Sequence, residues 1–180
     1  MKIEVLDTTL RDGAQAEGVT LSIDDKAECI RLFDELKIDY IEAGTPFANP
    51  KDKKLLCDDD VKTINSHLVA FGSTRHKNNL TDEDSALNLL SLSKTQFVSV
   101  VGKSSVTQAE KVLQVSAQDN LKMIYDSIRF LCDRNKTVFF DAEHFFDGYK
   151  ENPDYALDTL RTAKNAGAKL LVLFDTNGAS

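Results

Sequence analysis

The chain has 180 residues, of which 42% are hydrophobic and 28% are charged, a composition typical of a globular protein with a substantial core. Its formal net charge of −7 argues against nucleic acid and anionic membranes as partners. The N-terminus lacks the apolar segment of a signal peptide, and no apolar run reaches the length of a membrane span. Three widely spaced cysteines in helical patterns predict reduced thiols and a cytoplasmic location.

Apolar segments typical of strands alternate along the chain with segments typical of helices. The predicted strands are residues 3–8, 39–44, 68–71, 96–101, 137–140 and 170–174. The predicted helices are residues 24–37, residues 53–65, a helix capped within 81–84, helices opened at Thr107 and at Ser116, and one between Pro153 and Gly167. Ser22 to Asp25 form a capping-box signature, and Asn152-Pro153 is an N-cap followed by proline.

Regular alternation of this kind predicts a parallel sheet, which is either doubly wound or a (β/α)₈ barrel. No glycine-rich dinucleotide loop follows the first strand, which argues against a Rossmann fold. Polar residues follow every predicted strand, and in a barrel all these strand ends open onto the catalytic face. They are Arg11/Asp12, Glu42, Arg75/His76, Lys103/Ser104, Glu143/His144 and Asp175/Thr176/Asn177. The sequence therefore favours a TIM-type barrel.

A complete barrel needs about 250 residues. We therefore expect residues 1–180 to be a single catalytic-barrel domain that is incomplete at its C-terminus and truncated after about six βα units. The first and last strands would then have unpaired edges, which favours pairing with a second chain, as in a homodimer. An open six-stranded sheet that is stable alone is the competing interpretation.

The most informative stretch is residues 7–15, where Arg11, Asp12 and Gly13 follow the first predicted strand. A carboxylate is a hard oxygen ligand for a metal ion, and a guanidinium is a permanent cation with several donors. Gly13 would allow a sharp backbone turn. The alternative for an isolated Arg–Asp pair is a surface salt bridge.

Residues 7–15 resemble the opening signature of the isopropylmalate, homocitrate and citramalate synthases, which share a barrel with HMG-CoA lyase. Further segments are most similar to the citramalate synthase branch, and they keep their order along the chain. They are residues 41–44, Pro46, and residues 49–52, 70–75, 101–104, 141–150 and 175–178.

This resemblance implies a Claisen-type condensation in branched-chain amino acid biosynthesis. A base removes an α-proton from the acetyl group of acetyl-CoA, and the enolate attacks the keto carbon of an α-keto acid, pyruvate in the citramalate branch. Thioester hydrolysis then releases CoA. The resemblance also implies a divalent metal (Mg, Mn or Zn) that binds the keto acid and acts as a Lewis acid.

The roles of individual residues follow from the same resemblance. Asp12 matches a metal ligand, Arg11 a group that stabilises the developing alkoxide, and Glu143 the general base. Substrate binding is implied for Arg11, Gln15, Glu42 and Thr176. Thr176 would hydrogen-bond the keto-acid carboxylate, and Glu42 would orient its neighbours.

Several alternatives remain open at this point. Glu143 could instead pair with a neighbouring cation, and Lys103 could steer the CoA phosphates or be solvated. We expect structural or hydrogen-bonding roles for His67, His76 and His144, because the family's His-x-His metal ligands would lie beyond Ser180. Residues 105–107 depart from the aromatic residue and histidine usual in the family, which bears on the handling of acetyl-CoA.

Three other functions compete with a citramalate synthase. A 2-isopropylmalate or homocitrate synthase would differ in a few apolar side chains of the pocket. An aldol cleavage like that of HMG-CoA lyase is disfavoured by the resemblance of residues 49–52 and 141–150 to the synthases. The third is a half-barrel without catalytic activity that acts through chain pairing, for which the discriminator is whether two histidines reach Asp12.

Overall fold

The computed structural model describes residues 2–58 and 61–178. The chain folds into two compact units. The first unit comprises Met1–Gly72 and Leu89–Val98, and the second comprises Ser73–Asn88 and Ser99–Ser180.

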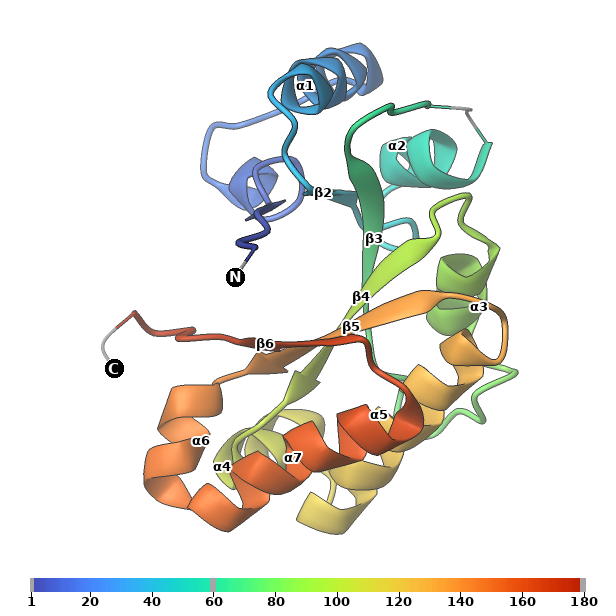
Figure 1. The fold of residues 1–180 in the computed structure, drawn as a ribbon. Helices are drawn as coiled ribbons and strands as arrows, with labels where there is room; N and C mark the ends of the chain where they lie inside the picture. Colours follow the sequence, from blue (N-terminus) through green and yellow to red (C-terminus); the bar gives the residue numbers. More distant parts are fainter. Residues whose placement is uncertain (1, 59–60, 179–180) are drawn as a thin grey trace. The chain divides into compact units, whose positions relative to one another are not determined.

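Six strands form one sheet whose strand order is the same as the chain order (Figure 1). They are β1 (Leu6–Asp7), β2 (Tyr40–Gly44), β3 (His67–Ser73), β4 (Phe97–Lys103), β5 (Thr137–Glu143) and β6 (Leu170–Leu173). Strands β1 and β2, β2 and β3, and β5 and β6 pair in parallel. A doubly wound sheet reverses its order at a switch point, so this order excludes the doubly wound alternative and fits a barrel.

Helical segments follow every strand but β6, as the alternation predicted (Figure 1). They are the helices α1 (Ile23–Glu35), α2 (Pro50–Lys53), α3 (Ser85–Leu92), α4 (Val106–Gln108), α5 (Ala117–Cys132), α6 (Phe145–Glu151) and α7 (Pro153–Ala166), the 3₁₀ turn η1 (Gly13–Gln15), and the π-helical segments η2 (Lys54–Asp58) and η3 (Ala109–Leu113). Within residues 2–58 and 61–178, no helix combines the length and apolarity needed to cross a membrane.

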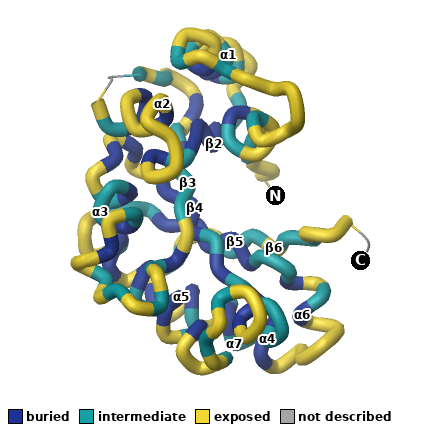
Figure 2. Tube along the Cα trace, turned by 180° about the vertical axis from the view of Figure 1, so that it is seen from behind, coloured by how far each residue is buried: buried dark blue, intermediate teal, exposed yellow. Residues whose placement is uncertain are grey.

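Buried residues lie along β2, β4 and β5, whereas exposed residues lie mainly on helices and loops (Figure 2). In the first unit, the rings of Tyr40, His67 and Phe97 pack together at the starts of β2, β3 and β4. The Tyr40 and Phe97 rings meet edge to face, and 4.5 Å separates the His67 and Phe97 ring centroids. His67 therefore has the structural role predicted for it. In the second unit, α7 lies alongside α5, and Phe139 and Phe140 of β5 are fully or almost fully buried.

Several helix caps follow the sequence signals. The Ser22 side chain accepts the Asp25 N–H at 3.0 Å and the Asp25 carboxylate accepts the Ser22 N–H at 2.8 Å, which confirms the capping box. Ser116 caps α5, and Asn152 caps α7 ahead of its proline. Gly167 ends α7 with φ of 112°, a conformation that favours glycine.

The predicted bounds were wrong at two early elements. Strand β1 covers only Leu6–Asp7, because the Val5 N–H donates to the Asp39 side chain and Ile3 is exposed. Helix α2 begins at Pro50, behind an Asn49 cap, and not at Lys53. The helical segment ends at Asp58 and residues 61–65 are not helical; residues 59–60 of the predicted helix lie outside the described part of the chain.

The later helices also differ from prediction. Helix α3 begins at Ser85, because the Asp84 carboxylate accepts the Ala86 and Leu87 N–H groups. The helical segment predicted to open at Thr107 is capped by Ser105 and becomes π-helical at Ala109. Helix α6 was not predicted at all.

The remaining strands lie within three residues of their predicted bounds.

The segment before β3 is held by one carboxylate. Asp34 on α1 accepts the backbone N–H groups of Ile64, Asn65 and Ser66 at 2.7–3.1 Å. Burial acts to raise the pKa of Asp34, but these backbone hydrogen bonds outweigh it and lower the pKa below its ordinary value. Residues 61–66 lie outside helices and strands, so their N–H groups have no backbone acceptor from regular secondary structure and need a side-chain acceptor.

We predict that Asp34→Asn lowers the free energy of unfolding by about 2–3 kcal/mol at pH 7, since an amide oxygen replaces a charged acceptor of three N–H groups. Because the folded-state pKa is lowered, the carboxylate stabilises the protein above the ordinary Asp pKa of 3.8 and loses this effect as the pH falls below it. The difference between wild type and variant should therefore shrink from pH 6 to pH 3 in urea unfolding. Asp24→Asn, at an exposed position of the same helix, should cost less than about 1 kcal/mol; equal losses would contradict the prediction.

Candidate functional site

The Arg11 guanidinium is buried and paired with a carboxylate of the neighbouring strand. Its Nε donates to Glu42 Oε2 at 2.6 Å, and the side chains are only 9% and 1% exposed. The guanidinium carbon lies 4.0 Å from the centroid of the Phe71 ring, in cation–π geometry. Arg11 is therefore held by β2 and β3 and is not a surface side chain.

Asp12 is the exposed partner of the same guanidinium. Arg11 Nη1 donates to Asp12 Oδ1 at 2.9 Å, and the Asp12 side chain is 65% exposed. The turn that presents both residues is closed by the Thr8 carbonyl, which accepts the N–H groups of residues 11, 12 and 13. The sequence suggested that Gly13 is needed for a sharp turn, but the structure does not show this need. A Cβ at Gly13 would meet only ordinary contacts with Thr9 at 3.6 Å.

A cavity of about 300 Å³ lies beside this turn in the first unit. Arg11 and Gln15 line it, which brings two of the predicted substrate-binding residues to one cavity. Its other lining residues are Leu10, Ala14, Val19, Thr20, Leu21, Lys26, Thr45, Ala48, Asn49, Lys51 and Asp52. The wall combines apolar and polar groups, which is typical of sites for small molecules.

One wall of that cavity is held by a buried ion pair. Lys26 Nζ lies 2.5 Å from Asp52 Oδ1 and donates to the Ala43 carbonyl at 3.0 Å. Asp52 Oδ2 accepts the Thr45 N–H at 2.9 Å. Gly44 has φ of 153°, and a Cβ there would lie 2.4 Å from the Asp52 carboxylate. The end of β2 is therefore anchored to α1 and α2.

The second unit places Glu143 at the end of β5 beside Lys103 at the end of β4. The Lys103 ammonium donates to Glu143 Oε2 in a short ion pair, with side chains 17% and 27% exposed. The Ser104 N–H donates to the Glu143 carbonyl at 2.9 Å. Glu143 therefore does pair with a neighbouring cation, and Lys103 is not free in solvent.

Thr176 lies against the turn that follows Glu143. Its Oγ1 accepts the His144 N–H at 2.8 Å, so its hydroxyl hydrogen can be donated to another group. His144 has φ of 56°, a strained conformation of the kind found at functional sites. Asp147 Oδ2 lies 3.3 Å from His144 Nδ1 and accepts from Asn177 Nδ2 at 2.7 Å.

The departure from the family at residues 105–107 has a structural role here. The Ser105 and Thr107 hydroxyls donate to the Glu151 carboxylate of α6 at 2.8 and 2.5 Å. The hydrogen bond from Thr107, aided by the one from Ser105, holds the pKa of Glu151 below its ordinary range against the opposing effect of burial. These residues join the start of α4 to the end of α6.

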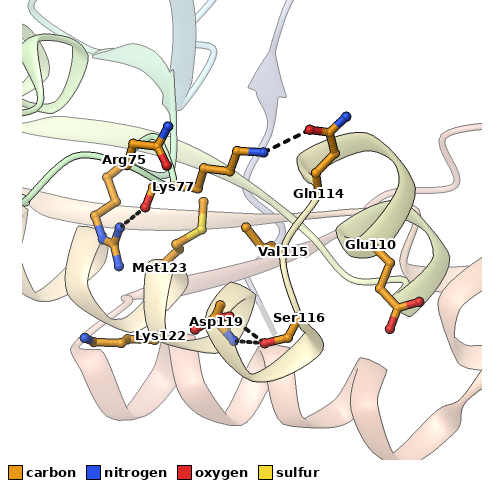
Figure 3. Close-up of a pocket in the computed structure, with 10 residues that line it drawn as sticks. Arg75, Lys77, Glu110, Gln114, Val115, Ser116, Asp119, Lys122 and Met123 are labelled. Atoms are coloured by element: carbon orange, nitrogen blue, oxygen red, sulfur yellow. Dashed lines mark hydrogen bonds between the residues drawn. The ribbon is translucent and has the colours of Figure 1, made fainter.

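The second unit also contains an open groove of about 750 Å³, formed by the segment after β3, η3 and the start of α5 (Figure 3). Lys77 reaches across it to Gln114 Oε1 at 3.0 Å. The Arg75 guanidinium is already bound to Asp126 at 3.2 Å and to the Asn79 carbonyl at 3.1 Å. None of the predicted catalytic or substrate-binding residues lines this groove.

The predicted site residues thus divide between the units. Arg11, Asp12, Gln15 and Glu42 belong to the first, and Glu143 and Thr176 belong to the second. In the part of the chain that the structure describes, no group of three or more His, Cys, Asp or Glu side chains could hold a metal ion. His144 and His76 make hydrogen bonds to Asp147 and to the Asn78 N–H, as expected.

Sequence reasoning missed three contributors to these clusters. Phe71 lies under the guanidinium, the Lys26–Asp52 pair anchors β2, and α6 supports the start of α4. Phe71 lies within residues 70–75, a segment that resembles the family, so the sequence could have indicated that it contributes to the site. A single sequence offers no comparable signal for Lys26 and Asp52, because they are 26 residues apart.

Comparison with known proteins gives consistent matches. A model of the HMGL-like family matches residues 2–180. The (R)-citramalate synthase of Sulfolobus acidocaldarius is 44% identical over 99% of this chain, and the 2-isopropylmalate synthase of Sulfurisphaera tokodaii is 30% identical over 98%. The chain spans about a third of the length of the citramalate synthases that it matches, 34% in the case of S. acidocaldarius.

Solved structures confirm the fold. HMG-CoA lyase of Bacillus subtilis superimposes with a TM-score of 0.79 at 19% identity, covering 99% of this chain and 60% of the lyase. The predicted barrel type is thereby confirmed, with six of its strands present in this chain. The family match over nearly the whole chain and the 44% identity lead to the same conclusion: the chain belongs to the HMGL-like family.

Proposed function

We propose that this protein functions as an (R)-citramalate synthase, an enzyme that condenses acetyl-CoA, pyruvate and water to citramalate and CoA. The carbon–carbon bond forms between the acetyl methyl carbon and the keto carbon of pyruvate. Hydrolysis of the thioester bond then releases CoA and makes the overall reaction irreversible.

The observation that carries this proposal is the difference in identity between two groups of relatives. Five (R)-citramalate synthases are 41–45% identical over 97–99% of this chain. Three 2-isopropylmalate synthases are only 29–30% identical over 98%. Both groups match the same length of chain, so the difference reflects the residues and not the coverage.

In this proposal Arg11 binds the keto acid and stabilises the negative charge that develops on the keto oxygen. A guanidinium has five N–H donors, and within the described residues its hydrogen bonds to Glu42 and Asp12 use two of them. The Arg11 side chain is only 9% exposed beside Phe71, and a fixed charge has its largest effect where water is excluded. Gln15, on the same cavity, offers an amide to the substrate.

A divalent metal fits only in part. Asp12 presents one carboxylate, which we propose as a ligand, and a bound metal would act as a Lewis acid on the keto acid. A metal site needs about four to six ligands. Residues 2–58 and 61–178 contain no group of three candidate ligands, so these residues alone do not form a complete metal site.

The second unit supplies the remaining proposed roles. Glu143 Oε1 takes the α-proton of the acetyl group, and the electron pair of the broken C–H bond becomes the enolate. Thr176 donates its hydroxyl hydrogen to the keto-acid carboxylate, which its acceptance of the His144 N–H leaves possible. Function as a homodimer and a cytoplasmic location stay predictions, which gel filtration and cell fractionation would check.

We predict that the protein releases CoA from acetyl-CoA with pyruvate faster than with 2-ketoisovalerate or 2-ketoglutarate, when a divalent metal is supplied. Asp12→Ala should lower the rate at least 100-fold, because a ligand and the exposed partner of Arg11 are lost together. The measurement is thiol release at saturating substrate. A preference for 2-ketoisovalerate would reassign the protein to the isopropylmalate branch, and no release with any keto acid would contradict the proposal.

We also predict that Glu42→Gln lowers kcat/KM for pyruvate at least tenfold, since the amide no longer holds the guanidinium as an ion pair. Removing one partner of a buried pair leaves an uncompensated charge, so the free energy of unfolding should fall by about 2–4 kcal/mol. Asp12→Asn, at the exposed partner of the same guanidinium, should cost less than about 1 kcal/mol. Steady-state kinetics and urea unfolding of both variants make the comparison; similar losses of stability would show that Glu42 is not the main anchor.

A further inference from the structure

We propose that Lys103 is a positioning residue for the base: it holds Glu143 through Oε2, which leaves Oε1 to take the acetyl proton. The inference rests on the proposed function, because it assigns Lys103 a part in the same proton transfer. Lys103 keeps its own proton throughout. The C–H bond of the acetyl methyl group breaks, the O–H bond forms at Oε1, and the electron pair remains in the enolate.

The contact itself is one-sided. The Lys103 ammonium donates to Oε2, and within the described residues no other side-chain hydrogen bond of Glu143 is present. A carboxylate held at one oxygen loses most of its rotational freedom, whereas the second oxygen stays available. A base must lie within hydrogen-bond reach of the proton that it takes, so a fixed carboxylate favours the transfer.

Lys103 can act in this way because the backbone that carries it is clamped. Its carbonyl accepts from Asn120 Nδ2 of α5 at 2.8 Å, and the same Nδ2 lies 2.7 Å from the hydroxyl of Tyr155 on α7. Asn120 is fully buried. Two helices therefore fix the end of β4 at the residue that pairs with Glu143.

The next residue is held just as tightly. The Ser104 N–H donates to the Glu143 carbonyl, and Ser104 Oγ lies 2.9 Å from Thr159 Oγ1. A Cβ at Gly148 would lie 2.1 Å from the Ser104 carbonyl oxygen, so α6 meets this segment backbone to backbone. The support around the Lys103–Glu143 pair thus comes from three helices.

Two other roles for Lys103 fit less well. A solvated lysine would be mostly exposed, yet this side chain is only 17% exposed. A lysine that attracts the phosphates of CoA from a distance would act through its net charge, but the charge of the Lys103 ammonium is largely compensated by the paired Glu143 carboxylate. The family-like segment 101–104 is therefore best explained by the pairing of the two strand ends.

The experiment measures initial rates of CoA release from acetyl-CoA and pyruvate for Lys103→Met, Lys103→Arg and Glu143→Gln. Lys103→Met should lower kcat about 10- to 100-fold while both KM values change less than about threefold. Exchange of the acetyl methyl protons with D₂O should fall in parallel. Lys103→Arg keeps a cationic donor and should recover kcat to within about fivefold of wild type. Combining Lys103→Met with Glu143→Gln should be no slower than Glu143→Gln alone.

The matched control is Lys164→Met, which removes the same charge at an exposed position of α7 and should leave all rates unchanged. Urea unfolding of each variant tests the ion pair independently of activity. The change in the unfolding equilibrium constant of the double variant should differ about fivefold from the product of the changes caused by Lys103→Met and Glu143→Gln alone.

Unchanged kcat in Lys103→Met, a rise in the KM for acetyl-CoA alone, or no coupling would overturn the inference and leave the proposed function standing. A wild-type protein that releases no CoA with any keto acid would overturn both.

Discussion

The Arg11 guanidinium lies in the protein interior, where an unpaired charge would cost several kcal/mol. Glu42 on the neighbouring strand supplies the opposite charge, and Phe71 on the next strand supplies an aromatic face. The pair therefore ties the end of β1 to β2 and β3, even though β1 itself has only two paired residues. An ion pair of this kind is weak grounds for added stability, because apolar residues could replace it at little cost. In the proposed function, the pair has a different effect, because it fixes a cation at the strand ends.

The same solution recurs between β4 and β5. Ser99 donates to Asp141 at 2.5 Å in the buried part of these strands, and Lys103 pairs with Glu143 at their ends. A strand that is buried on both faces can carry a polar side chain only if a neighbouring strand or helix satisfies it. The polar strand ends of this fold are thus partners of one another, and the proposed reaction would use the donors and acceptors that this pairing leaves over.

The order of strands and helices was predictable because it depends on local patterns: apolar runs, capping residues and turn residues. Ser22, Ser116 and Asn152 cap helices as their side chains predict. The same reasoning would have found α2 from Asn49-Pro50, which is a cap signal of the same kind as Asn152-Pro153. Two other elements could not be predicted from local patterns, because they depend on distant partners. The segment before β3 depends on the Asp34 carboxylate, and helix α6 depends on contact with the Ser104 backbone.

The candidate site shows the same limit at the level of single residues. The motif of residues 7–15 identifies Arg11 and Asp12 as a pair, but only the structure separates a buried cation from an exposed carboxylate. Residues 105–107 are the clearest case, because the sequence shows only that they depart from the family pattern. The structure adds that Ser105 and Thr107 bind Glu151, which connects α4 to α6. Both hydrogen bonds are donated by hydroxyl groups, so this connection depends on the side chains that the chain has at residues 105 and 107.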